Sequence, residues 1–312
     1  MAQNKRRKEE IQNAILKNNA RRKVMNKIFT IATIASVALA MIPLGSILFE
    51  VVKNGASAIT FEFLTEPQGA IRCFNIDENV EDCPRGGVGP AIQGTLLVVA
   101  YASLIGVPVG VLTGIYLSEY AGDNKFARGV RFFNNVMTGL PSIVIGIVGY
   151  VLLVLTIGSF NVTAGAVALS IIMIPIVVGV TEETLKLVPN SVREAAHSLG
   201  IPKWKVTLFI TLNSAKNGVL TGIVLALSRI AGETAPLIMT ILGTSLFFES
   251  VTSPVDALPL RIWRLASLPY EQAHSFGWGA ALILILIILA VSVALRVLVL
   301  ERRSKFRIST KM

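Results

Sequence analysis

Charged residues are scarce in this sequence. Only 15% of its 312 residues are Asp, Glu, Lys or Arg, whereas 53% are hydrophobic and the mean hydropathy is +0.66. A soluble domain carries charge at about a quarter of its positions. The apolar residues are gathered into runs of roughly 20, the length that crosses the hydrocarbon core of a bilayer. The sequence therefore predicts an all-α integral membrane protein that crosses the membrane several times.

Motifs for catalysis and nucleotide binding are absent as well. The chain has no G-x-x-x-x-G-K-[ST] segment, so it has no P-loop with which to hold a nucleotide itself. Its two histidines, His197 and His274, are isolated from each other and from the cysteines, which leaves no spacing typical of a metal site. No serine stands in the nucleophile elbow of a hydrolase. We expect no catalytic centre, no metal and no cofactor in this chain.

Basic residues outnumber acidic ones, and the formal net charge is +10. Such an excess can indicate nucleic-acid binding. Here the basic residues flank the apolar runs, and no arrays of aromatic and basic residues are present. The excess therefore indicates membrane topology, and nucleic acid is not expected as a partner.

The apolar runs divide the chain into four parts. Residues 1–27 form a basic arm that we expect to be helical, and residues 28–87 comprise the first membrane span, Ile28–Phe49, with a polar external loop. Residues 88–300 form a core with five further spans, and residues 301–312 form a basic tail. The core spans are expected at Val88–Leu117, Asn135–Ile157, Val162–Thr181, Asn217–Leu242 and Phe276–Leu300.

The second span contains glycines at every fourth position. Gly106, Gly110 and Gly114 form a stripe of small residues, which is typical of helices that approach a neighbour closely inside a membrane. We expect this stripe to face another span of the core.

The distribution of charge predicts the orientation of the chain. With the N-terminal arm inside the cell, six spans put the loop at 119–133, the loop at 182–216 and the C-terminal tail inside too. Nearly all flanking Lys and Arg residues then become cytoplasmic, as the positive-inside rule requires. We therefore expect both termini in the cytoplasm. The external loops keep only Lys53, Arg72, Arg85, Arg261 and Arg264.

The loop at 182–216 has a folded pattern of its own. Ser191 followed by Glu194 matches a capping box, which predicts a helix beginning at this point. Gly200 suits the left-handed residue after the last helical turn, and a second amphipathic piece is expected from about Lys203 to Leu212. The first helix would expose a narrow face to another protein, or would lie on lipid or on the chain's own helices. That apolar face consists of Val192, Ala195, Ala196 and Leu199.

Two charged residues fall inside the fifth expected span. Arg229 is placed near the middle of that span, and Glu233 follows one helical turn later on the same face. A charge at the bilayer centre costs from about 2.5 kcal/mol upward, so such residues are candidates for function. The alternative is an internal ion pair that only fixes helix packing.

Several segments resemble those of one family of membrane proteins. The loop at 182–216 resembles the EAA loop of ABC importer permeases, with Glu194-Ala195-Ala196, then Gly200, then Ile210-Thr211-Leu212. The family usually has a proline next, where this chain has Asn213. Further segments are similar to the A-type permease subunit of bacterial phosphate-specific ABC importers. These segments are Ala226–Leu237 (ALSRIAGETAPL), Pro141–Gly146 and Gly114–Tyr120.

The resemblance implies a six-span permease of the type I, MetI-like class in the inner or plasma membrane. It implies that the EAA helix docks as a coupling helix on a cytoplasmic ATPase dimer, which hydrolyses the ATP. A homologous second permease subunit and an extracytoplasmic phosphate-binding protein are the other implied partners, with phosphate as substrate. The residues concerned are Glu194, Ala195, Ala196 and Gly200 for coupling, and Arg229, Glu233 and Thr234 for the substrate path.

Three other functions stay open at this point. The same machine could carry another oxyanion, such as sulfate or molybdate. An ATP-independent carrier or channel is an alternative of a different class. The EAA pattern and its expected cytoplasmic placement argue against this alternative. A structural membrane scaffold is disfavoured by Arg229 within the bilayer.

A first testable prediction concerns the two cysteines of the chain. Cys73 and Cys83 both fall in the expected external loop, where thiols oxidise. A disulfide between them would close a loop of about ten residues and stabilise the protein by about 2–3 kcal/mol in the entropic model. We expect a maleimide to label neither thiol in intact, unreduced cells. Labelling of both thiols would show instead that the cysteines are free.

Overall fold

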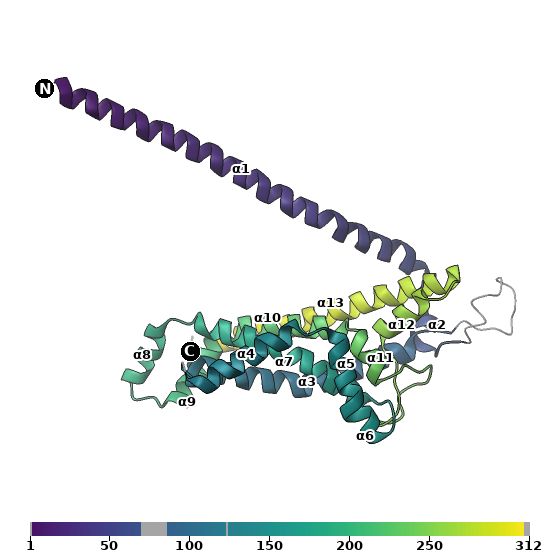
Figure 1. The fold of residues 1–312 in the computed structure, drawn as a ribbon. Coiled ribbons are helices and arrows are strands. Elements are labelled where there is room, and N and C mark those ends of the chain that lie inside the picture. The colour runs from purple at the N-terminus through teal and green to yellow at the C-terminus, as the bar shows by residue number, and fades with distance from the viewer. Residues whose placement is uncertain (1, 70–85, 123, 309–312) are drawn as a thin grey trace. The chain divides into compact units, whose positions relative to one another are not determined.

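The structure is a computed structural model that describes residues 2–69, 86–122 and 124–308, and of residues 2–21 and 298–308 the backbone alone. Cys73 and Cys83 lie outside the described residues, so their pairing stays a prediction. The chain forms two compact units, residues 1–53 and residues 54–312. Figure 1 shows the ribbon, in which helices make up nearly the whole described fold.

The first unit is one helix. α1 runs without a break from Ala2 to Gly55, so the basic arm and the first span are continuous, and the arm is helical as expected. Apolar side chains along the span, such as Ile34 and Leu39, are exposed. Because a helical stretch that is apolar all round must be covered by protein or by lipid, this exposure fits a membrane span.

The second unit is built on a close pair of helices, α3 (Gly89–Ile115) and α7 (Val162–Lys186). The glycine stripe of α3 makes this closeness possible. A Cβ atom added at Gly110 would lie 2.6 Å from the Cβ of Val177, and one added at Gly114 would lie 2.6 Å from the Cβ of Thr181. The predicted stripe is therefore confirmed, and its partner is α7.

The third expected span, Asn135–Ile157, lies in a longer segment that begins at Lys125 and is bent in the middle. α4 (Lys125–Gly139) starts ten residues earlier, and α5 (Ser142–Gly149) follows at an angle of 102° to α4. Pro141 lies at the break because its ring would clash with the carbonyl one turn earlier. Asn124 caps α4, since its side chain accepts from the Ala127 amide at 2.7 Å. Beyond α5 the segment ends in η4 (Tyr150–Val154), a π-helix, and α6 (Leu155–Ile157).

The fifth expected span, Asn217–Leu242, is wrong at both ends. Its helix α10 (Leu212–Ala231) continues α9 (Lys203–Lys205) and the π-helical η5 (Val206–Thr211), so the second amphipathic piece is the start of the span. α10 stops at Ala231, and the short α11 (Ala235–Thr240) follows. Pro236 explains the stop, because it has no amide for the helix ladder and clashes with the preceding turn.

The remaining helices complete a six-span fold. α13 (Glu271–Ile308) is the last span, preceded by α12 (Leu258–Ala266). Five helices are long and apolar enough to cross a membrane, and the bent segment α4 to α6 makes a sixth if it counts as one span. In Figure 1, α8 (Asn190–Ser198) and α9 lie at one end of the second unit, and α2 (Phe61–Thr65), α11 and α12 lie at the other.

The loop before α12 holds a buried ion pair. Asp256 is fully buried and Arg261 nearly so, and the Arg261 Nε donates to Asp256 Oδ2 at 2.6 Å. The Arg261 Nη2 also donates to the carbonyl of Thr244 at 3.1 Å. Burial raises the pKa of the Asp256 carboxyl and lowers the pKa of the Arg261 guanidinium, and the attraction between the two groups opposes both shifts.

This pair supports a second prediction, on stability. Asp256→Ala should lower the free energy of unfolding by about 3–5 kcal/mol, because it leaves a buried guanidinium without its counter-ion. Combining it with Arg261→Met should recover part of that loss, since no buried charge then remains. Thermal unfolding of the detergent-solubilised proteins measures both. Equal melting temperatures for wild type and the single variant would contradict the prediction.

Candidate functional site

Three segments that are far apart in the sequence meet around one cavity of the second unit. α4 and α5 form one wall, and α7 and the last turns of α10 form the other. The cavity has a volume of about 350 Å³. It brings together Pro141–Gly146 and the Arg229 segment, although the sequence offered no reason to pair them. Its lining consists of Met137, Thr138, Leu140, Ser142, Ile145, Ile172, Ile176, Leu225 and Arg229.

Arg229 supplies the charge of this cavity. It stands in the last turn of α10 rather than near the middle of a span, because α10 ends at Ala231. Its side chain is 56% exposed, and its Nη2 lies 3.4 Å from Glu233 Oε1. A guanidinium carries five N–H donors. The geometry therefore leaves donors of Arg229 free to meet a ligand in the cavity.

Glu233 and Thr234 lie in the link between α10 and α11. The expected spacing of one turn is kept, although Glu233 is no longer in the same helix as Arg229. The Glu233 side chain is only 15% exposed. Thr234 is the residue before α11 and is partly buried. In the described part of the chain, neither residue lines the cavity, and of the two Glu233 is the one that contacts Arg229.

α5 reaches the cavity because it packs closely on α11. A Cβ atom added at Gly146 would lie 2.7 Å from the Cα of Pro236, so only glycine allows this approach. α5 begins at Ser142, which lines the cavity. The first turn of a helix carries partial positive charge. The cavity wall is therefore polar at the start of α5 and cationic at Arg229.

The second candidate region is α8 (Asn190–Ser198), the helix of the EAA loop. Its predicted capping box is wrong. The N-cap is Pro189, two residues before Ser191, and no side chain caps the helix. Proline fixes its own φ near the value that precedes a helix, so Ser191 falls inside the first turn. The predicted end is confirmed, because Gly200 has φ +76° and its amide donates to the carbonyl of His197 at 2.9 Å.

The residues of α8 divide between the chain's own core and the outside. Ala196 is 5% exposed, so it is buried against neighbouring parts of the same unit. Glu194 and Ala195 are exposed, and Leu199 beyond the helix is 80% exposed. The exposed face of α8 is therefore narrower than the predicted apolar face, because Ala196 is turned towards the chain's own core.

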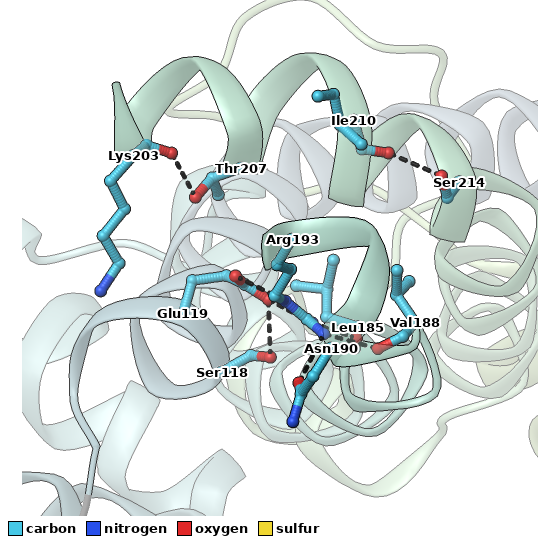
Figure 2. Close-up of polar contacts among 10 residues, drawn as sticks. All are labelled: Ser118, Glu119, Leu185, Val188, Asn190, Arg193, Lys203, Thr207, Ile210 and Ser214. Atoms are coloured by element: carbon cyan, nitrogen blue, oxygen red, sulfur yellow. Dashed lines mark hydrogen bonds and ion pairs between the residues drawn. The ribbon is translucent and has the colours of Figure 1, made fainter. Parts of the chain in front are cut away.

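Arg193 attaches α8 to the rest of the unit, as Figure 2 shows. Its Nη2 donates to Glu119 Oε1 at 2.7 Å and its Nε to Glu119 Oε2 at 3.2 Å. Its Nη2 also donates to the carbonyl of Leu185 at 2.8 Å. Sequence reasoning missed this pair, because 74 positions separate the two residues. The only signal was a carboxylate at the end of one span and an arginine in the loop.

Comparison with known proteins agrees with the fold and defines its class. The family described as binding-protein-dependent transport system inner membrane component matches residues 106–305. A solved structure of the MetNI methionine ABC transporter has the same fold, with TM-score 0.54 at 18% identity over 68% of this chain and 93% of that one. A bacterial ABC transporter for the polysaccharide alginate matches with TM-score 0.53 at 16% identity over 83% and 94%. The fold is that of a multi-pass ABC transporter permease.

Curated relatives narrow the class to one family. The phosphate transport system permease protein PstA of Yersinia pestis is 35% identical over 92% of this chain and 94% of its own length. PstA of Haemophilus influenzae is 38% identical over 84% and 89%, and PstA of Mycobacterium leprae 35% over 85% and 85%. The chain belongs to the PstA family of phosphate transport system permease proteins, as its motifs had indicated.

Proposed function

We propose that this chain is a permease subunit of an ATP-driven phosphate importer and that phosphate passes Arg229. The observation that carries the proposal is the half-exposed guanidinium of Arg229 in the cavity formed by α4, α5, α7 and α10. The relatives are named as phosphate transport permeases, which indicates the substrate. The cationic side chain in the cavity gives a chemical reason why an anion would bind there.

An anion in a low-dielectric path needs a fixed positive group. Burying a multiply charged phosphate without one is prohibitive. A guanidinium offers planar, charge-assisted donors that match phosphate oxygens, and it does not deprotonate at any physiological pH. The Ser142 hydroxyl on the opposite wall adds a neutral donor.

Glu233 has a different role, because a carboxylate repels the anion. Its oxygen lies 3.4 Å from the Arg229 Nη2, which is close enough for attraction and too long for a strong hydrogen bond. Glu233 therefore orients Arg229 and neutralises it between passages. This keeps phosphate binding weak enough for release.

Each proposed partner is assigned to the part of the chain that it would contact. A homologous second permease subunit completes the path beside the cavity. An ATPase dimer docks on α8 through the exposed Glu194 and Ala195, with Gly200 setting the turn that follows. An extracytoplasmic phosphate-binding protein delivers the substrate at the opposite end. This arrangement puts both termini and the loop at 182–216 in the cytoplasm, where the basic residues of the chain are concentrated.

The test is uptake of labelled phosphate by the complete assembly in proteoliposomes that contain ATP. We expect uptake that requires both ATP hydrolysis and the binding protein and that excess sulfate or molybdate does not inhibit. Inhibition by either oxyanion would favour the rival substrates. Uptake that persists with a hydrolysis-deficient ATPase would favour an ATP-independent carrier or channel.

A further inference from the structure

The end of α3 is wound as a π-helix, η3 (Tyr116–Tyr120). Its turn closes with the Ala121 amide donating to the carbonyl of Tyr116 at 2.9 Å. π-helical turns are rare, and they occur often at functional sites. η3 lies where α8 is anchored, and its residues make contacts with three other helices.

Two of these contacts come from α4. The Arg131 Nη2 donates to the carbonyl of Leu117 at 2.9 Å, and the same guanidinium donates through Nε to Glu182 of α7 at 2.7 Å. The Tyr116 ring packs edge-to-face on Phe126, with 6.3 Å between the ring centroids. η3 is therefore fixed to the α4–α7 side of the core.

The other contacts come from the loop that contains α8. Glu119 receives the forked pair of bonds from Arg193, and the Lys203 Nζ of α9 lies 4.9 Å from the centroid of the Tyr120 ring. The Glu119 side chain is 6% exposed and that of Arg193 is 18% exposed. Charge-assisted bonds are strong when they are forked and shielded from water in this way.

Arg193 also contacts the end of α7. It donates to the carbonyl of Leu185, in the last turn of α7, and to the carbonyl of Val188, two residues beyond the end of the helix. One side chain thus joins α8, the last turn of α7 and η3. Any displacement of α8 must move η3 or break this bond.

We propose that η3 is the joint through which α8 acts on the core, with Glu119 and Arg193 as its positioning residues. The proposal rests on the proposed function, in which α8 receives the movement of the ATPase. α8 alone makes the docking contact. The Glu119–Arg193 pair transmits the displacement to α3, and Arg131 passes it on to α4, whose far end forms part of the Arg229 cavity. Loss of the pair should uncouple ATP hydrolysis from transport without releasing the ATPase.

The experiment compares variants in the complete reconstituted assembly. Glu119→Gln removes the charge and keeps the shape. Arg193→Lys keeps the charge but cannot serve Glu119 and two carbonyls together. Lys186→Gln is the matched control, because Lys186 is 55% exposed and, within the described residues, bonds Glu182 and neither η3 nor α8. Co-purification of the ATPase and the ATP hydrolysed per phosphate taken up are measured for each.

We expect normal co-purification throughout. The ATP hydrolysed per phosphate should rise at least about fivefold in Glu119→Gln, the lower end of ordinary coupling effects, rise less in Arg193→Lys and not change in Lys186→Gln. An unchanged ratio in Glu119→Gln would overturn the proposal. If that variant fails to insert, an unchanged ratio in Arg193→Lys would overturn it instead. A wild-type assembly that retains no ATPase or moves no phosphate would show that the proposed function itself has failed.

Discussion

Arg229→Gln protein is expected to reach the membrane in near-normal amount and to transport almost no phosphate. The side chain lines the cavity and is more than half exposed, so its loss leaves little of the fold without support. Each hydrogen bond to a charged group contributes about 1.5–3 kcal/mol, and loss of two should lower uptake by about 100-fold or more. Membrane abundance and uptake of labelled phosphate are measured together.

Arg128→Gln is the matched control for this variant. Arg128 is an exposed residue of α4, and it does not line the cavity in the described structure. The same substitution there should leave uptake close to that of the wild type. If Arg229→Gln and Arg128→Gln transport equally well, the guanidinium in the cavity does not serve phosphate.

Glu233→Gln should fail in another way. Without its carboxylate, Arg229 keeps its full charge when the path is empty, so the anion is held more tightly or passes without control. We expect retained phosphate binding with slow release, or leak in the absence of ATP. Normal coupled uptake would show that neutralisation of Arg229 by Glu233 is not needed.

The second large effect is expected at the coupling helix. Gly200→Val should insert normally but weaken both ATPase association and phosphate uptake. A Cβ atom there meets nothing within 4 Å, so the effect comes from the backbone, where φ is +76°. A non-glycine residue in this conformation costs about 1–3 kcal/mol, and the turn after α8 relaxes by changing direction. Co-purification of the ATPase with the permease measures the loss.

Gly129→Val is the control for the backbone effect. Gly129 lies in α4, has no positive φ and likewise has open space around its added Cβ atom. It should leave ATPase association unchanged. Glu194→Lys provides a second variant, which reverses an exposed charge on α8 without disturbing a cap, since none is present. Normal ATPase association with both Gly200→Val and Glu194→Lys would contradict docking on α8.

Patterns among neighbouring residues predicted those parts of the fold that depend on a short stretch of sequence. The runs of apolar residues, the glycine stripe of α3 and the left-handed turn at Gly200 follow from helix length, close packing and backbone freedom. The breaks were harder to predict, because Pro108 and Pro175 stay within long helices, whereas Pro141 and Pro236 lie at the start of the helix that follows a break. Tertiary packing decides between these outcomes. In this chain, Gly146 on Pro236 is the contact that stabilises the two broken segments.

Contacts between distant segments explain what the sequence could not predict about the site. Arg229 was found as a charge in an apolar run, but the α5 wall that faces it comes from another part of the chain. The Arg193–Glu119 pair likewise joins residues 74 positions apart. Glu119 and the α5 wall lie in segments that the resemblance singles out, Gly114–Tyr120 and Pro141–Gly146, but nothing in either segment indicates its distant partner. Only the packing of α3, α7 and α10 brings these residues together.

Exchange of the two charges is the most direct test of whether phosphate passes Arg229. Arg229→Glu combined with Glu233→Arg keeps an ion pair in the link but removes the guanidinium from its place in the cavity. Membrane abundance and phosphate uptake are measured for both single variants and for the exchange. We expect normal abundance and no uptake for the exchanged protein. Uptake that is lost in the single variants and restored by the exchange would show that the pair is structural and that phosphate does not pass Arg229.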